Sequence, residues 1–100
     1  MIKIKSMANE GEINHYVLEM FPNIHNILIS FFHQLKFSSD EVDKLDVIFS
    51  EMNGAYFHVK KEDMKVHFFI HDDEVNMVID STKKQEELFN LMNKYFIFPK

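Results

Sequence analysis

Apolar residues along this chain recur at two different spacings. From Met1 to Lys5 apolar and charged residues alternate, which predicts a half-buried strand. Between residues 13 and 35 the spacing changes to three and four, which predicts helix. The residues of that stripe are Ile13, Val17, Met20, Ile24, Leu28, Phe31 and Leu35. Pro22 interrupts the stripe, so it is either one kinked helix or, as proline at a first helical position favours, a short helix followed by a longer one that starts near Pro22.

A further helix is expected to begin at Ser38. Ser38 and Glu41 have the spacing of a capping box, and Asp40 and Glu41 suit the positive end of a helix dipole. The apolar stripe behind this start consists of Val42, Leu45, Phe49, Met52, Tyr56 and Val59. Lys60 and Lys61 then fall where a helix C-terminus favours cations. The pattern therefore predicts one helix from Ser38 to about Lys61.

The segment from residue 65 to 80 is predicted to be a β-hairpin around Asp72-Asp73. With that turn, one face pairs Ile70 with Val75, Phe68 with Met77, and Val66 with Ile79. The other face pairs His71 with Glu74, Phe69 with Asn76, His67 with Val78, and Lys65 with Asp80. The first face is wholly apolar and the second is mixed, as expected for an antiparallel pair packed on one side.

The chain is expected to end in a helix and a short strand. Thr82 and Gln85 have capping spacing, and Leu88, Leu91, Met92 and Tyr95 form the stripe that follows. Phe96 to Phe98 is predicted as the last strand, stopped by Pro99. The element order indicates a single domain over residues 1–100, an α/β (α+β) two-layer sandwich. Its mixed, mainly antiparallel sheet would have about four strands, with helices on one face.

Composition narrows the function classes. The chain has 100 residues, 46% of them hydrophobic, a net charge of -5, no cysteine and no arginine. The lack of arginine together with the acidic charge argues against nucleic acid as a partner. No apolar run is long enough for a signal peptide or a membrane span, so we expect a cytoplasmic protein with no membrane partner. A protein partner, including a second copy of the chain, is the expectation that remains.

Metal binding is not expected. His67 and His71 share a strand face but are separated by about 13 Å, and His25 and His33 are separated by about 12 Å on a helix. Neither distance suits one zinc ion. The acidic run Asp72-Asp73-Glu74 lacks the glycine and ligand spacing of a calcium loop. We therefore predict no metal site.

The order of elements and several of their residues resemble the GHKL ATPase superfamily, nearest the bacterial anti-sigma factor serine kinases. Those proteins have a strand and a long helix, then a helix of the form E-x-x-x-N-A-x-x-H. The matching segments are Ser39 to Leu45 for the start of that helix, Ser50 to His58 for its end, Lys65 to Asp80 for the central strand pair, and Leu88 to Phe98 for the last helix and strand. The resemblance implies a nucleotide-binding scaffold.

The departures from this family imply that the chemistry has been lost. Glu51 and Asn53, the residues that would act as base and magnesium ligand, are two apart instead of four, so they point about 200° apart on a helix. Aligned on Ala55 and His58 instead, the chain has Gly54 at the asparagine position. Asp80 is kept, but the glycine two residues later is Thr82, and no glycine-rich lid follows. We expect no kinase or ATPase activity, no catalytic residues and no cofactor.

Two sets of residues remain as candidate sites. Glu51, Asn53, His58 and Asp80 are the candidates for a vestigial pocket. His67, Phe69, Asn76 and Val78 are the candidates for an interface on the open face of the hairpin, since an apolar cluster across two strands can mark a contact surface. The leading hypothesis is a non-catalytic, regulatory protein-binding domain resembling a minimal anti-sigma factor, whose partner is a sigma factor or another regulator. The alternatives are a ligand- or nucleotide-binding enzyme-like domain that reuses the pocket, and a small acidic inhibitor from a phage or mobile element.

Overall fold

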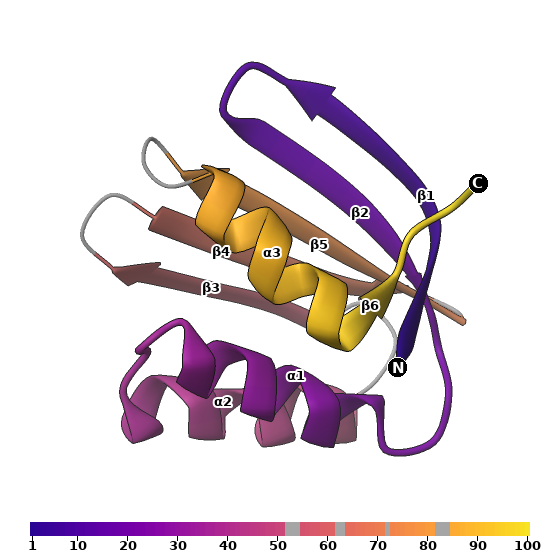
Figure 1. Ribbon diagram of the computed structural model, residues 1–100. Coiled ribbons are helices and arrows are strands. Elements are labelled where there is room, and N and C mark those ends of the chain that lie inside the picture. Colours follow the sequence, from indigo (N-terminus) through magenta and orange to yellow (C-terminus); the bar gives the residue numbers. More distant parts are fainter. Residues whose placement is uncertain (52–54, 62–63, 72, 82–84) are drawn as a thin grey trace.

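The computed structural model describes residues 1–51, 55–61, 64–71, 73–81 and 85–100, and it describes the side chains in these ranges except those of 46–51, 55–61 and 85. Two strands come first, two helices follow, then three strands, a helix and a short strand (Figure 1). The bounds are β1 Ile2–Glu10, β2 Ile13–Glu19, α1 Ile24–Gln34, α2 Ser39–Glu51, β3 Ala55–Lys61, β4 Met64–His71, β5 Glu74–Ser81, α3 Gln85–Tyr95 and β6 Phe96–Ile97.

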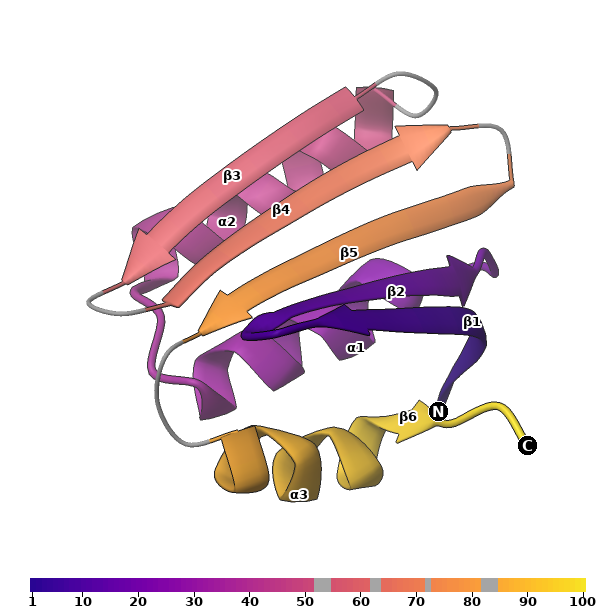
Figure 2. The same cartoon turned by 90° about the horizontal axis from the view of Figure 1, so that it is seen from above.

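The strands form one six-stranded sheet in the order β3-β4-β5-β2-β1-β6. All neighbours pair antiparallel except β1 and β6, which pair in parallel through Ile2–Phe96 and Lys3–Ile97. Viewed from above, α1 and α2 lie behind the strands and α3 lies along the β6 edge (Figure 2). The predicted two-layer sandwich with helices on one face is thus confirmed. Its sheet is larger than predicted because two strands had been read as helix.

One hydrophobic core fills the space between the two layers. Strand residues of alternating position supply one wall, and the helices supply the other. The fully buried members with the largest side chains include Phe31, Phe32, Phe68, Phe96 and Met77. Their rings pack edge to face, with Phe31 5.1 Å from both Phe32 and Phe96, and Phe32 5.5 Å from Phe68. Such aromatic pairs add about 0.5–1.5 kcal/mol each to the free energy gained by burial.

The predicted hairpin is confirmed in its register. Ile70 pairs with Val75, Phe68 with Met77, and His67 with Val78. The alternation in burial matches as well, since Phe68 is fully buried and Phe69 is 40% exposed. Period-two alternation determines the register here because a slip by one residue would turn the whole apolar set to solvent.

The prediction of helix from residue 13 to 20 is wrong, because this segment is strand β2. Its burial alternates with period two: Tyr16 and Leu18 are buried between more exposed neighbours. β2 pairs with β1 on one side and β5 on the other. Gly11, with φ +62°, sits in the two-residue turn between β1 and β2, a backbone conformation that glycine adopts without strain. Tertiary pairing on both edges therefore overrides the helical spacing of Ile13, Val17 and Met20.

The prediction of helix beyond Glu51 is also wrong. Residues Ala55–Lys61 form strand β3, and all seven pair with β4. Tyr56 and Val59 therefore belong to the sheet, and Lys60 and Lys61 end a strand instead of a helix. Within α2, Val42 and Leu45 are buried as predicted. Met52 lies outside the described residues, as does the side chain of Phe49.

The other elements agree with the sequence pattern. Helix α1 begins at Ile24, two residues after Pro22, and buries Ile24, Leu28 and Phe31. In α3, Leu88 and Met92 are buried, and Leu91 and Tyr95 pack partly against the core. The short strand at Phe96 is present. The expected cap on α3 involves Thr82, which lies outside the described residues.

The Ser38 half of the predicted capping box on α2 is present, and the Glu41 carboxylate bonds the Ser38 hydroxyl instead of its backbone N–H. The Ser38 hydroxyl donates to Oε1 of Glu41 at 3.0 Å and accepts from the backbone N–H of Glu41 at 3.3 Å. Replacing Ser38 by alanine is expected to lower the free energy of unfolding by about 1 kcal/mol, because one N–H at the helix start loses its acceptor. Urea denaturation measures this change. Ser39→Ala, at the adjacent exposed helical position, is the control and should have a smaller effect, and equal effects would contradict the capping role.

Candidate interaction surface

In Figure 2 the face of the sheet that points away from α1 and α2 lies toward the viewer, and no helix crosses it. On this face lie two adjacent cross-strand rows that carry no lysine, aspartate or glutamate in their described part. One row runs Ser6, Val17, Asn76, Phe69 and the other runs Ala8, His15, Val78, His67. We call these residues the central band. With its histidines neutral, the central band is an uncharged strip across β1, β2, β5 and β4.

Charged residues flank the central band at both ends of the strands. One end row contains Glu10, Ile13, Asp80 and Lys65, and the other contains Glu19, Glu74 and His71. Lys5, at the bulge in β1, joins the second row by reaching across β2 to Glu74, where its Nζ lies 2.7 Å from Oε1. The hydrogen bond to Glu74 raises the pKa of Lys5 above its ordinary value. We call these two sets the end rows.

Polar groups within and beside the band contact one another. Nε2 of His15 lies 3.0 Å from Oδ1 of Asn76, which bridges β2 and β5. The rings of Phe69 and His71 stack at 6.0 Å with an angle of 17° between their planes. His15, Val17, Asn76 and Val78 are half-buried by their neighbours alone. The band is therefore a pre-arranged surface of aromatic, aliphatic and neutral polar groups.

All four residues predicted as an interface lie together in the central band. His67 is opposite Val78, and Phe69 is opposite Asn76. The sequence reading missed His15 and Val17, which extend the band onto β2, because their segment had been assigned to a helix. Residues 13–19 do not alternate between apolar and polar types, and the local signal for a strand is Gly11 as a turn residue directly before them.

The residues proposed for a vestigial pocket come from separate parts of the fold. Glu51 is the last residue of α2 in the helix layer, and His58 lies on the edge strand β3. Asp80 lies on β5, in an end row of the uncovered face, with β4 between it and β3. Asn53 lies outside the described residues. The pocket formed by these four residues stays a prediction.

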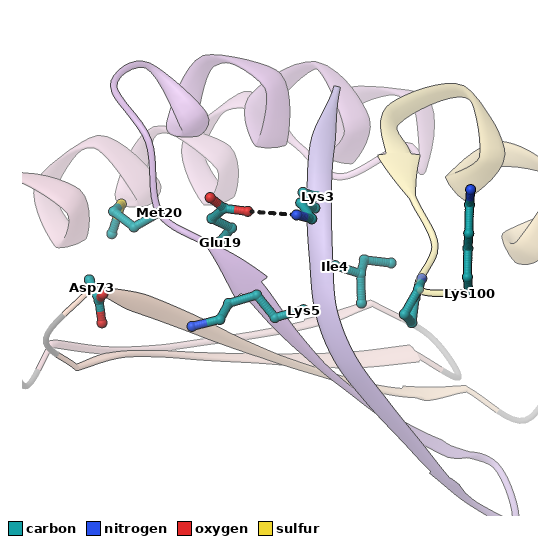
Figure 3. Close-up of a pocket in the computed structure, with 8 residues that line it drawn as sticks. Lys3, Ile4, Lys5, Glu19, Met20, Asp73 and Lys100 are labelled. Carbon is teal, nitrogen blue, oxygen red and sulfur yellow. Dashed lines mark ion pairs between the residues drawn. The ribbon is translucent and has the colours of Figure 1, made fainter.

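A groove of about 630 Å³ opens between the start of β1, the end of β2 and the C-terminal segment (Figure 3). Its charged lining residues are Lys3, Lys5, Glu19, Asp73 and Lys100. Nζ of Lys3 lies 3.8 Å from Oε2 of Glu19, and both side chains are more than half exposed. The groove is therefore lined mainly by exposed charged side chains, two of which form an ion pair, and it lies next to an end row of the uncovered face.

The part of the chain that the structure describes was searched for metal-ligand clusters and for membrane-spanning helices. No group of three or more histidine, aspartate or glutamate side chains there is arranged to hold a metal ion. Over the same residues, no helix combines the length and the apolar character needed to cross a bilayer.

Comparison with protein-family models, curated proteins and solved structures found no match to this chain. The arrangement of its surface is therefore the basis for a functional assignment.

Proposed function

We propose that this chain is a non-catalytic protein-binding domain that binds its partner through the central band. The observation that carries the proposal is the distribution of charge on the uncovered face: a neutral strip that includes Phe69, Val17 and Val78 lies between two charged end rows. Protein interfaces have this anatomy, with charged residues depleted at the centre and present at the rim. Phe69, at 40% exposure, is the aromatic anchor of the strip.

The non-catalytic part of the proposal rests on the sequence, which lacks the glycine-rich segments that a phosphate cradle requires. The regulatory part, a role like that of an anti-sigma factor, rests on the resemblance in sequence alone. Binding through the central band does not depend on that relation, so the two parts are separately testable.

The binding role is tested by affinity capture from the cytosol of the source cells with three forms of the chain. We expect the wild type to retain a stoichiometric protein partner that Phe69→Glu loses, because a carboxylate buried at the centre of an interface is left without a counter-charge. Phe89→Glu is the matched control, because Phe89 is 52% exposed on α3, away from the band. It should retain the partner. Equal recovery by the wild type and Phe69→Glu would contradict the proposal.

A further inference from the structure

We propose that the central band binds a second copy of this chain face to face, and that protonation of His15 and His67 dissociates the resulting dimer. This inference rests on the proposed use of the band for protein binding and specifies both an occupant and its regulation.

The size of the uncovered face is sufficient for a dimer. The four strands that carry the central band, β1, β2, β5 and β4, have seven to nine residues each. At about 4.8 Å between strands and about 3.3 Å per residue, they span a projected face of about 500 Å². Stable interfaces bury about 800 Å² of accessible surface per partner. The accessible area of a sheet face is larger than its projected area because side chains protrude from it. Face-to-face packing of two sheets at about 10 Å is a common arrangement.

The distribution of charge makes the face self-complementary. Two-fold dimers use the same patch on both subunits. The central band occupies the middle of the strands and the end rows occupy both ends. A two-fold axis in the plane between two copies therefore places the central band of one copy against the central band of the other. No end-row charge is then placed over the neutral strip. A surface with its charge at one end only would lack this property.

One such axis also matches charges at the rim. When it runs along the strands between β5 and β2, Lys65 of one copy comes over Glu10 of the other, since these residues occupy opposite edges of one end row. In the other end row the same axis brings Glu74 over Glu19. Each of these two carboxylates already has a lysine partner within its own chain. Among the charges that this axis superposes, the two Lys65–Glu10 pairs therefore favour this arrangement.

The histidines make the dimer sensitive to pH. With this axis, His15 comes over Val78 of the second copy and His67 comes over Ala8, so an apolar side chain covers each imidazole. The contact of His15 with Asn76 lies within one chain and is present in both states. Imidazole changes charge between about pH 5 and 8, and covering it with apolar groups disfavours the charged form. Protonation is thus easier in the free chain than in the dimer. By linkage, affinity is highest where the imidazoles are neutral and falls as decreasing pH protonates them.

Other charged groups near these histidines do not cancel this difference. Around His15, Glu10 lies diagonally on β1 and Asp80 diagonally on β5. Around His67, Asp80 lies diagonally on β5, Lys65 lies two residues away on β4, and the register places His58 opposite on β3, with Tyr56 and Lys60 diagonal to it. All of these belong to the same chain and act on the histidines in both the free and the dimeric states. The dimer adds the apolar cover over each imidazole and, at the ends of the strands, the end-row charges of the second copy.

Sedimentation velocity with circular dichroism on the same samples tests the proposal. At about pH 8 we expect a mass near twice the 12.0 kDa of one chain, and at about pH 5.5 a folded monomer, with dimer affinity at least about tenfold weaker. The double variant H15Q/H67Q keeps neutral polar groups in place and should remain dimeric at both pH values. Phe69→Glu should be a folded monomer at both, and Phe89→Glu should behave as the wild type.

Three results would overturn the proposal: a wild-type monomer at about pH 8 even at about millimolar concentration, a dimer insensitive to pH, or loss of fold instead of dissociation at about pH 5.5. Equal dissociation of H15Q/H67Q and the wild type would also overturn the role of the histidines. A monomeric wild type that still captures another protein in a Phe69-dependent way would leave the proposed binding function standing. If the chain were monomeric and also captured no protein partner, both the dimer and the proposed binding function would be contradicted.

Discussion

Replacing Phe68 by glutamate is expected to unfold the domain, whereas the same replacement at its neighbour Phe69 is expected to leave the fold intact. Phe68 is fully buried and packs edge to face on Phe32 at 5.5 Å, while Phe69 is 40% exposed on the opposite face of the sheet. At Phe68 the variant loses about 3–5 kcal/mol of aromatic packing and buries an unpaired carboxylate at a further cost of several kcal/mol. Domains of this size are stable by only about 5–15 kcal/mol.

Circular dichroism and thermal melting of the two variants measure this difference directly. We expect no cooperative melt for Phe68→Glu and a melt within a few degrees of the wild type for Phe69→Glu. If both variants unfolded, the sheet would be covered on both faces and the central band would be part of a core. If both remained folded, the assignment of the buried face of the hairpin would be wrong.

The second large effect is expected at Phe31, where helix α1 meets the C-terminal elements. Its ring packs edge to face on Phe32 at 5.1 Å, on Phe96 at 5.1 Å and on Tyr95 at 5.6 Å. Phe31→Ala removes these contacts and leaves a cavity, which costs about 3–5 kcal/mol. For about 100 residues each kcal/mol corresponds to about 4–8 °C, so the Tm should fall by about 12–40 °C.

Differential scanning calorimetry of Phe31→Ala checks this value, with Phe89→Ala as the matched control. Phe89 is 52% exposed and contacts Phe98 at a ring distance of 5.2 Å, so its truncation should cost less than about 1 kcal/mol. A loss below about 1 kcal/mol for Phe31→Ala would show that α1 and α3 are not packed through this aromatic cluster.

Where local pattern and tertiary contacts agree, the sequence alone was sufficient. The hairpin of β4 and β5 could be predicted residue by residue, because only one register puts Phe68 and Ile70 on a common apolar face. The start of α2 could be predicted from Ser38 and Glu41, because a helix cap is made by residues three apart in sequence.

Residues 13–19 and 55–61 could not be assigned from local spacing. Ile13, Val17 and Met20 fit a helical stripe, and Tyr56 and Val59 continue the stripe of α2, so periodicity alone favours helix in both places. These segments are strands because other strands satisfy their backbone hydrogen bonds: β2 lies between β1 and β5, and β3 pairs along its whole length with β4. The pairing of β2 with β5 joins residues about 60 apart in sequence, and no short window of sequence contains both strands.

The candidate site shows the same division. The sequence by itself determined that His67, Phe69, Asn76 and Val78 share the outward face of a hairpin, because alternation and turn position are local properties. Only the tertiary structure decided that the surface continues onto β2 through His15. Which strand lies beside β5 depends on how the buried faces of all strands and helices pack around one core, and that choice minimises exposed apolar area over the whole chain instead of within any one segment.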